Sequence, residues 1–582
     1  MDGLLILGNF LVDLEQNIGN KTRLVSARSI FKDICKTNAP MLIKSKKQTF
    51  YKEAVNTECE IASAVGENIL KKGGNAADAA IATAIAIGTV NSFSAGIGGG
   101  GFLMIKNGED AEFIDFRETA PLAATEAYYA DHPDHLRTTL KSTLVPGEIK
   151  GLHLLHKRHG RLPWAVLLEE PIEMCENGIR VSLLLSLKLQ NNKEAVLNDP
   201  GFREIYTKNG KLREEGDVIY RKNLGQTLRK VAADPDTFYK GEVADRIAEF
   251  HQKNGGFITK EDLVKYEAKI RPVYKSKFKE YTVYTASLPT SGPFVALALN
   301  ILQLFDLKEF YKKLNVNNEF YVFHFLIEIF KFMFMHRGDV EDPDEMKEPS
   351  EVEKLYRSEE FAADLFKKIT FDRPLERKTI QHSEFKEDHG TTHMNILDSQ
   401  GMAVLITTTV NLEFGSIVMD PISGIIYNNT MDDFALPSVP NAYELETPGT
   451  NRIKPGKRPF SSIAPTILES ENSLLLIGAA GGTKIPTSIV STILFFYLTN
   501  DLHKAITLPR IHDQLMPSTT FVESTFPYII TEQLKQLGHD IKVCLNIGTF
   551  TSVNGICARR TEKGFVIEAA SDLRKLGHSC GL

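Results

Sequence analysis

Residues 388–412 read DHGTTHMNILDSQGMAVLITTTVNL, and no other stretch of the chain carries as much information about its fold. Apolar and polar residues alternate on both sides of Asp398-Ser399-Gln400-Gly401, a sequence typical of a tight turn. The pattern therefore predicts a β-hairpin. If the turn centres near residue 400, the numbers of antiparallel partners sum to about 800, which places Thr391 opposite Thr409.

Thr391 stands at the head of the first expected strand, directly after the flexible residue Gly390. A threonine at the N-terminus of a chain can be both nucleophile and base, because its own α-amine lies beside its Oγ. The ordinary alternative is that β-branched threonines simply favour strands. Taken alone, the hairpin favours this ordinary alternative.

Three further segments place polar groups or glycines next to expected strands. They are 428–434 (NNTMDDF), 457–462 (KRPFSS) and 478–483 (GAAGGT). The first clusters carboxylates and amides, and the second offers paired hydroxyls that could bind a carboxylate. The third offers backbone N–H groups that could stabilise an oxyanion. Each segment alone also fits a simple loop, cap or turn.

Taken together and in this order, the segments closely resemble the gamma-glutamyltranspeptidase family, whose members are also called glutathione hydrolases. Four more segments match the family, namely 73–80 (GGNAADAA), 116–121 (FRETAP), 145–148 (VPGE) and 160–164 (GRLPW). The resemblance runs from about residue 55 to the C-terminus.

The resemblance implies an α+β fold, the four-layer αββα arrangement of N-terminal-nucleophile hydrolases. Such proteins are made as precursors that cut themselves before the nucleophile. Here the cut would fall between Gly390 and Thr391, giving a large chain of residues 49–390 and a small chain of residues 391–582. Residues 1–48 would be an N-terminal extension or a degraded leader. The two chains are expected to interweave into one catalytic unit.

The family's catalytic residues carry over by position. The resemblance assigns Thr391 as the nucleophile, with its freed amine as the base. Thr409 matches the hydroxyl that assists the nucleophile. Gly481 and Gly482 match the oxyanion hole.

The substrate-binding residues also carry over by position. The residues matched to the α-carboxylate of a γ-glutamyl group are Arg117, Ser461 and Ser462. A guanidinium suits this role because it can bind both carboxylate oxygens at once. The residues matched to the α-ammonium are Asn411, Thr430 and Asp433.

The implied reaction breaks the γ-glutamyl amide of glutathione and other γ-glutamyl compounds through an ester on Thr391. The ester is passed to water or to an amino acid or dipeptide acceptor, and the chemistry requires neither a cofactor nor a metal. One departure concerns Thr430, where the family usually has Glu or Gln, so the grip on the α-ammonium is expected to be weaker. Two alternatives remain open: an acylase of the same fold that acts on another amide, and a catalytically silent relative that only binds.

Composition and charge exclude several other classes of protein. The formal net charge of −6 gives no global reason to bind nucleic acid. None of the six cysteines is spaced as CxxC, which leaves zinc ribbons unsupported. At roughly 150 residues per domain, 582 residues suggest about four domains. Because residues from Arg117 to Gly482 must converge on one site, a single interwoven unit is expected instead.

Outside the matched site, helices are expected before residue 91, a hairpin around Asn107-Gly108, a largely helical middle from about 150 to 370, and β-rich sequence from 391 to about 426. A GxGxxG pattern at Gly96, Gly98 and Gly101 follows a helix and precedes a strand. That order is the reverse of a dinucleotide site and indicates a crowded backbone passage.

The histidines of two expected helices raise the question of metal binding. His153, His156 and His159 fan too widely over one helix to share an ion, so they are expected to be surface residues. Residues 320–335 (FYVFHFLIEIFKFMFM) predict a buried helix rather than a membrane span. Its polar residues recur on one stripe, which is expected to be a wet edge: His324, Glu328 and Lys331.

The resemblance places the protein outside the cytosol, at the cell surface, secreted or vacuolar. Residues 3–12 are apolar but follow Asp2 rather than a basic cluster. They are therefore not expected to be a signal peptide. No anchor is evident from the sequence.

Overall fold

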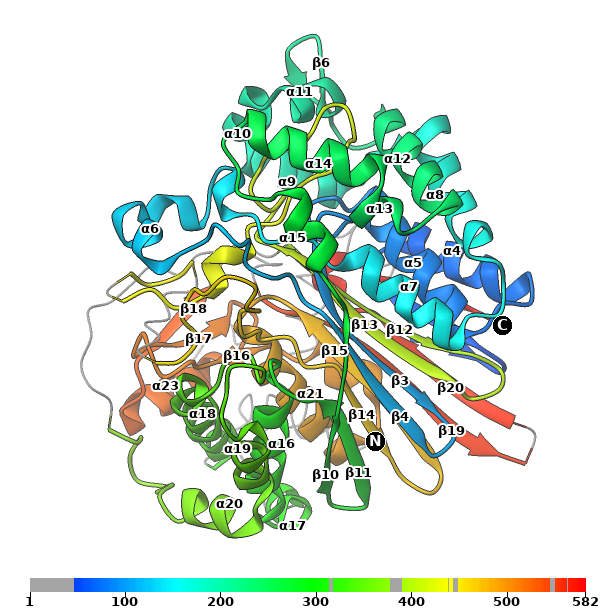
Figure 1. Ribbon diagram of the computed structural model, residues 1–582. Helices are drawn as coiled ribbons and strands as arrows, with labels where there is room; N and C mark the ends of the chain where they lie inside the picture. The colour runs from blue at the N-terminus through cyan, green and yellow to red at the C-terminus, as the bar shows by residue number, and fades with distance from the viewer. Residues whose placement is uncertain are drawn as a thin grey trace, which may run out of the picture.

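The computed structural model describes residues 47–312, 318–376, 390–437, 439–442, 449–544, 550–562 and 564–582. Nearly all of the expected extension, residues 1–48, lies outside these ranges. In the described part, two seven-stranded sheets are stacked face to face, with helices covering both outer faces (Figure 1). The layers are therefore helix, sheet, sheet and helix.

The first sheet contains the hairpin predicted around residue 400. Its strands, in spatial order, are β21 (His578–Gly581), β2 (Ala54–Thr57), β12 (Gly390–Leu397), β13 (Ala403–Asn411), β3 (Gly100–Asn107), β4 (Asp110–Phe116) and β9 (Lys269–Arg271). The second sheet comprises β1 (Gln48–Phe50), β20 (Gly564–Ala570), β19 (Ser552–Thr561), β15 (Ser473–Ala480), β14 (Thr466–Glu469), β11 (Tyr281–Ala286) and β10 (Val273–Phe278). Both sheets combine strands from before and after the Gly390–Thr391 bond.

Helices cover each sheet on one face. The first sheet is covered by α4 (Glu60–Lys71), α5 (Ala76–Val90) and α7 (Glu148–His159), and α8 (Trp164–Asn177) and α12 (Lys222–Ala233) pack outside them. The second sheet is covered by α16 (Gly292–Gln303), α21 (Lys484–Thr499) and α22 (Leu502–Thr507). The α5 helix begins directly after Asn75, and Asn75 and Asp78 form a reciprocal capping box.

The remaining elements surround this framework. The helices are α6 (Glu126–Asp131), α9 (Leu183–Asn191), α10 (Lys193–Asn198), α11 (Pro200–Tyr206), α13 (Thr237–Lys240), α14 (Glu242–Lys253), α15 (Lys260–Lys265), α17 (Leu307–Lys312), α18 (Phe320–Met335), α19 (Pro349–Arg357), α20 (Glu359–Phe366) and α23 (Tyr528–Leu537). Smaller sheets are formed by β16 (Ile511–His512), β17 (Thr520–Glu523) and β18 (Ile541–Cys544), by β5 (Ile179–Arg180) and β8 (Val218–Ile219), and by β6 (Thr207–Lys208) and β7 (Lys211–Leu212).

The β12–β13 hairpin lies at the centre of the first sheet, and the predicted register is confirmed because Thr391 pairs with Thr409. Every residue of both strands is buried, since one face meets helices and the other meets the second sheet. Successive side chains alternate between these faces. Val404 packs in the cluster on the helix side, whereas Leu405 packs in the cluster that includes the second sheet.

The glycine run before β3 is the crowded passage that the sequence predicted. A Cβ at Gly98 would lie 2.0 Å from the carbonyl oxygen of Ile426, and one at Gly101 would lie 2.2 Å from that of Thr407. Glycine is required here because the backbone of another segment occupies the space of a side chain. The early hairpin of β3 and β4 around Asn107-Gly108 is also confirmed.

The middle region is largely helical, as expected, and it also contains the β10–β11 hairpin at the edge of the second sheet. Two expectations about the fold need correction. The strands that start at Gly390 end at Asn411 rather than near Ile426, and turns follow. The polar stripe of α18 is not a wet edge, since His324, Glu328 and Lys331 are fully buried.

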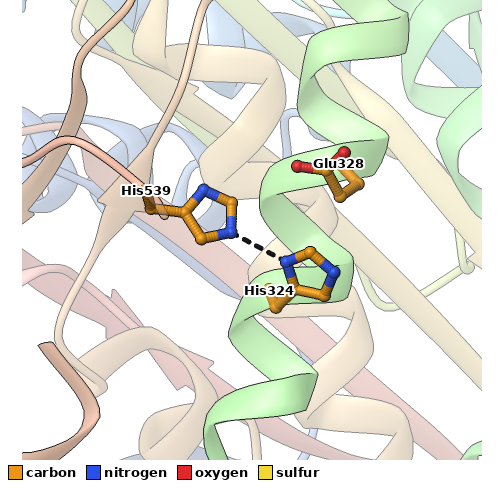
Figure 2. Close-up of side chains that lie close together, drawn as sticks. All are labelled: His324, Glu328 and His539. Atoms are coloured by element: carbon orange, nitrogen blue, oxygen red, sulfur yellow. Dashed lines mark hydrogen bonds between the residues drawn. The ribbon is translucent and has the colours of Figure 1, made fainter. Parts of the chain in front are cut away.

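The α18 stripe can be buried because its polar groups have partners inside the protein. His324 Nδ1 lies 2.7 Å from His539 Nε2 (Figure 2). Lys331 Nζ lies 2.5 Å from Glu328 Oε1. Buried polar groups are tolerated when they are hydrogen-bonded or paired. In the described part of the chain, no helix combines the length and apolar character needed to cross a bilayer.

Candidate active site

The hydroxyls of Thr391 and Thr409 face each other across the hairpin, with 2.9 Å between their Oγ atoms. Thr409 donates its hydroxyl proton to the carbonyl oxygen of Gly390 at 2.6 Å and accepts the backbone N–H of Asn411 at 2.8 Å. A hydroxyl has only one proton to donate. Thr391 must therefore be the donor in the pair. A chain of hydroxyls thus runs from Thr391 to the carbonyl of the peptide bond that precedes it.

The backbone around this peptide bond departs from regular strand geometry. The register of β12 and β13 shifts between Gly390 and Thr391, and Asn411 opposite them has a φ of 77°. A Cβ at residue 390 would lie 2.0 Å from the carbonyl oxygen of Leu412. Only glycine fits at this position, and bulges of this kind often occur beside active sites.

Lys575 holds the backbone of Thr391 from the far end of the chain. Its Nζ donates to the carbonyl oxygen of Thr391 at 2.6 Å and pairs with Glu58 Oε2 at 3.0 Å. Glu58 also accepts the hydroxyl proton of Ser94 at 3.0 Å, and all of these side chains are buried. The buried ammonium is thus neutralised by Glu58 while it fixes the candidate nucleophile.

Asn411 connects the hairpin to the segment of residues 428–433. Its Nδ2 donates to the carbonyl oxygen of Asn429 at 3.0 Å. The next residues form a short 3₁₀ turn, η4 (Thr430–Asp433). Because the backbone N–H of Asn411 also bonds to Thr409, a continuous hydrogen-bonded path links the paired hydroxyls to this turn.

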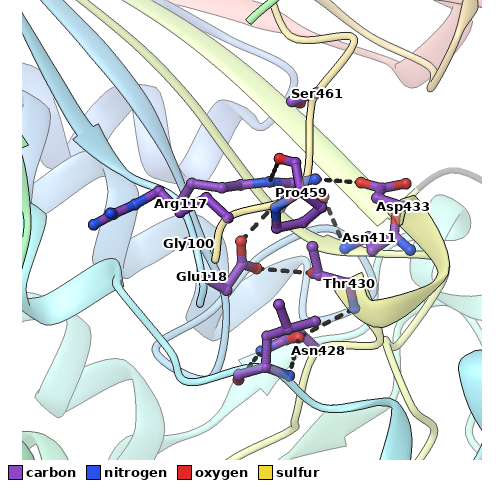
Figure 3. Close-up of polar contacts among 12 residues, drawn as sticks. Gly100, Arg117, Glu118, Asn411, Asn428, Thr430, Asp433, Pro459 and Ser461 are labelled. Atoms are coloured by element: carbon purple, nitrogen blue, oxygen red, sulfur yellow. Dashed lines mark hydrogen bonds and ion pairs between the residues drawn. The ribbon is translucent and has the colours of Figure 1, made fainter. Parts of the chain in front are cut away.

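Arg117 lies directly after β4 and is 1% exposed. Its guanidinium contacts the carboxylate of Asp433, and its Nη1 lies 3.5 Å from Glu118 Oε2 (Figure 3). Its Nε donates to the carbonyl oxygen of Pro459 at 3.4 Å. Three segments of the chain therefore hold the guanidinium. We call Arg117, Glu118, Thr430 and Asp433 the Arg117 cluster.

The Arg117 cluster contains two carboxylates and one cation. Thr430 donates its hydroxyl proton to Glu118 Oε1 at 3.0 Å, and both residues are fully buried. Burial raises the pKa of Glu118, while the charge of Arg117 and the hydrogen bond from Thr430 act in the opposite direction. An ionised Glu118 would leave the cluster with a net negative charge.

The paired serines lie in the segment that follows Pro459, the residue whose carbonyl oxygen accepts from Arg117 Nε, and Figure 3 shows Ser461 in this segment. Ser461 Oγ accepts the backbone N–H of Ile463 at 3.2 Å, and Ser462 Oγ accepts a hydrogen bond from Arg337 at 3.1 Å. Arg337 also lies over the ring of Phe460 at 4.6 Å. The serine hydroxyls are thus held by the backbone and by a second arginine.

Gly481 and Gly482 form the turn between β15 and α21, with φ values of 143° and 59°. A Cβ at Gly478, earlier in β15, would touch the imidazole of His393 in β12. The first residues of β15 pair with β19 at the end of the sheets where the turn after β12 lies. β15 and β12 therefore run in opposite directions, and β15 ends where β12 begins. The glycine turn therefore lies at the same end of the sheets as Thr391, at the N-terminus of α21, where backbone N–H groups favour negative charge.

The sequence of this chain is similar to those of known proteins. The family model of Gamma-glutamyltranspeptidase matches residues 62–582. The chain belongs to the gamma-glutamyltranspeptidase family. It is 36% identical over 492 residues to glutathione hydrolase proenzyme 1 of Schizosaccharomyces pombe, covering 83% of this chain and 78% of that one. It is also 36% identical to glutathione hydrolase 2 of Arabidopsis thaliana, covering 81% of this chain and 82% of that one.

The fold of this gamma-glutamyltranspeptidase family member agrees with a solved structure. The structure of cephalosporin acylase from Bacillus halodurans superposes with a TM-score of 0.80 at 26% identity, covering 93% of this chain and 97% of that one. The α+β, four-layer N-terminal-nucleophile hydrolase fold expected from the sequence is thus confirmed. The protein is an enzyme of the γ-glutamyl-transferring type.

Three residues that contact the matched catalytic and binding residues were not predicted from the sequence. They are Lys575, Glu118 and Arg337. Lys575 lies 184 residues from Thr391, and Glu118 lies 312 residues from Thr430. Contacts this distant in the chain leave no periodic pattern. One local signal was present, because Glu118 follows directly after Arg117 in the matched segment FRETAP.

In the described ranges, one group has the chemistry of metal ligands, namely His324, Glu328 and His539, with ligand atoms within 4.8 Å of one another. The two imidazoles already meet directly at 2.7 Å. Glu328 accepts hydrogen bonds from Lys331 Nζ at 2.5 Å and from the backbone N–H of Leu375 at 2.8 Å. Because Lys331 already balances Glu328, a divalent cation would add uncompensated buried charge. The group fits a structural network that ties α18 to the segment after α23.

Proposed function

We propose that this chain cuts itself between Gly390 and Thr391 and that the freed Thr391 then transfers the γ-glutamyl group of glutathione. The observation that carries the proposal is the chain of hydroxyls from Thr391 through Thr409 to the Gly390 carbonyl. It joins a nucleophile, a proton path and the carbonyl to be attacked. The matched relatives support the substrate, since those of Schizosaccharomyces pombe and Arabidopsis thaliana are named glutathione hydrolases.

The first reaction is the cut. Thr391 Oγ attacks the carbonyl carbon of Gly390, and its proton passes to Thr409, which gives its own proton to the developing oxyanion. The C–N bond then breaks, the nitrogen of Thr391 takes up a proton, and Gly390 is left as an ester on Oγ. Water hydrolyses this ester. The products are a large chain that comprises residues 49–390 and a small chain of residues 391–582.

The second reaction uses the amine created by the cut. It accepts the proton of Thr391 Oγ as the oxygen attacks the γ-carbonyl of the donor. Backbone N–H groups at Gly481 and Gly482 stabilise the oxyanion. The leaving amine takes the proton and departs, and the γ-glutamyl ester on Thr391 passes to water, an amino acid or a dipeptide. No cofactor enters any step.

Recognition of the donor rests on the Arg117 cluster and its neighbours. Arg117, Ser461 and Ser462 bind the α-carboxylate, while Asn411, Thr430 and Asp433 bind the α-ammonium. In the free site Arg117 and Asp433 contact each other. A zwitterionic γ-glutamyl group supplies one opposite charge to each of them, so binding exchanges one buried ion pair for two.

Gel electrophoresis with N-terminal sequencing tests the proposal. The wild-type protein resolves into two chains, the smaller beginning at Thr391, and releases the chromophore of a γ-glutamyl anilide. Thr391→Ala remains one chain and releases none. A wild-type protein that stays uncut and inactive would contradict the proposal.

A second candidate is an acylase that uses donors without an α-ammonium, favoured by the likeness to the Bacillus halodurans cephalosporin acylase. A glutaryl anilide, which lacks only the α-ammonium, distinguishes the two. The γ-glutamyl function predicts that wild-type protein prefers the γ-glutamyl anilide. Equal or better use of the glutaryl anilide would establish the acylase instead.

We also place the protein outside the cytosol, at the cell surface, secreted or vacuolar, on the family resemblance alone. Fractionation of cells that express the native gene, followed by detection of the small chain, tests this location. Recovery of the processed protein with cytosolic markers would contradict it.

A further inference from the structure

The hydroxyl of Thr430 has a fixed orientation because of Glu118. Its Oγ donates to Glu118 Oε1 at 3.0 Å, and neither side chain is exposed (Figure 3). The backbone N–H of Thr430 is bonded to Asn428 Oδ1 at 3.1 Å, which fixes the residue from the other side. A Cβ at Gly100 would lie 3.0 Å from Glu118 Cδ, so β3 also confines the carboxylate.

This orientation determines what Thr430 can offer to a ligand. Because the single hydroxyl proton goes to Glu118, the lone pairs of Oγ are left to accept from a donor. A hydroxyl that donates to a carboxylate is also polarised by it, which strengthens it as an acceptor. The Thr430 hydroxyl therefore suits a cation with N–H groups rather than an anion.

The charges of the Arg117 cluster favour the same kind of ligand. Arg117 and Asp433 neutralise each other, and Glu118 adds a second carboxylate within 3.5 Å of the same guanidinium. A bound ammonium would compensate that extra negative charge. Thr430 is short and neutral, but the carboxylate of Glu118 supplies a negative charge one hydrogen bond away from its hydroxyl.

We propose that Glu118 is a positioning residue for the α-ammonium of the γ-glutamyl donor and acts on it through the hydroxyl of Thr430. This inference rests on the proposed function, since it requires Thr430 to face the donor. It specifies the substrate class more narrowly: the donor must carry a free α-ammonium, and an N-acylated or des-amino donor leaves the Glu118 charge uncompensated.

Ionisation of Glu118 is coupled to binding of the ammonium. Burial raises the pKa of Glu118, and a nearby cation lowers it again. The charged and titratable groups around Glu118 are Arg117, Asp433, Glu148 and Tyr266. Affinity for the donor should therefore fall when the pH falls through the pKa of Glu118, and a variant without this carboxyl should lack that dependence.

The test is a double-mutant cycle on kcat/KM for a γ-glutamyl anilide. Glu118→Gln keeps an acceptor for Thr430 but removes the charge, and Thr430→Val removes the hydroxyl but keeps the shape. Each is expected to lower kcat/KM about tenfold, the usual scale for a hydrogen bond to a charged group. The double variant should be little worse than either single variant, because both break the same link. Independent, multiplying losses would overturn the inference.

Two control experiments separate this link from a general effect of buried charge and from misfolding. Glu319→Gln neutralises another buried carboxyl whose pKa burial raises, and it should keep the wild-type pH dependence of kcat/KM, whereas Glu118→Gln should flatten its acid limb. If Glu118→Gln fails to fold or to cut itself, Thr430→Ser and Thr430→Val decide. Serine should recover most of the kcat/KM that valine loses, because it restores the hydroxyl that donates to Glu118, and equal losses would overturn the inference.

These outcomes are separable from a failure of the proposed function. A wild-type protein that releases no anilide refutes the proposed function and the inference together. An active wild type whose Glu118→Gln variant keeps both its kcat/KM and its pH profile refutes the inference alone.

Discussion

At the hairpin end of the site, Gly390, Thr391 and Thr409 are positioned by the ladder between β12 and β13, and the side-chain contacts across it are neutral, while the buried Lys575 ammonium holds the Thr391 carbonyl. At the other end, Arg117 and Asp433 lie on segments outside the strands and are held by charges. Asn411 connects the two ends through its backbone N–H and its amide.

The difference indicates what each end must do. A nucleophile must keep one geometry through cutting and acyl transfer, and a paired backbone in the middle of a sheet provides such rigidity. A zwitterion must displace an existing ion pair, and charged side chains on turns can exchange partners without breaking a sheet. Substitutions at the hairpin end should therefore affect the cut, whereas substitutions at the charged end should affect only the use of the donor.

The largest effect is expected at Gly390. Gly390→Ala places a methyl group 2.0 Å from the carbonyl oxygen of Leu412, so the backbone of β12 must move and the cut should be abolished. The measurement is the fraction of cut chain on a denaturing gel over time. Gly555→Ala in β19 is the control, because its nearest contact is a methyl group of Leu502 at 3.2 Å and the carbonyl oxygen of Leu476 lies 3.3 Å away, far less crowded than at Gly390. Normal cutting by Gly390→Ala would show that the bulge is not required.

The next effect is expected at Thr409. Thr409→Val keeps the shape but removes the hydroxyl that polarises the Gly390 carbonyl, which should slow the cut by about 100- to 1,000-fold, as for loss of one oxyanion donor. The rate is measured from the appearance of the small chain after refolding or synthesis. Thr409→Ser restores the hydroxyl and should recover most of the rate. Equal rates for serine and valine would exclude the proton path.

The hairpin was predictable because a period of two and a turn signal fix both the strands and their register, hence the Thr391–Thr409 pair. The roles matched to Arg117 and Asp433 came from resemblance, since nothing local indicates that residues 316 positions apart will meet. The same limit explains why Lys575 was missed. The α18 stripe shows a related limit: spacing places His324 and Glu328 on one face, but it cannot reveal that His539 covers that face.

The β10–β11 hairpin is a strand pair that the sequence did not predict within the largely helical middle region. Lys275 and Lys277 point to solvent while Tyr274, Ser276 and Phe278 are buried, so the strand alternates as an edge strand should. The hairpin is a short element between α15 and α16, and the helical periodicity of the surrounding sequence hides it. Strand pairing with β14 in the second sheet, rather than local propensity, stabilises it.

A smaller effect is expected at the charged end. Arg117→Lys keeps the charge but loses the planar fork, and kcat/KM for a γ-glutamyl anilide should fall about 30-fold, or about 2 kcal/mol. The cut should proceed normally. Arg137→Lys is the matched control, because Arg137 pairs with the adjacent Asp432 at 2.9 Å. Loss of the cut in Arg117→Lys would show that the two ends are not independent.

The smallest expected effect is on the pH dependence of stability, and it concerns the hairpin end of the site. Burial lowers the pKa of His393 in β12 to about 4, from 6.5, so the imidazole is neutral in the folded chain. Between these values the unfolded chain binds the proton more readily, and stability falls as the pH falls from 6.5 toward 4.

The corresponding measurement is urea unfolding at pH 7 and at pH 5.5. Between these conditions the wild-type protein should lose about 1 kcal/mol more than His393→Gln, since that variant has no imidazole to titrate at this position. The other buried histidines, such as His512, titrate equally in both proteins and cancel in the difference. An equal loss would mean that the imidazole is protonated within the fold, and the neutral character of the hairpin end would no longer hold.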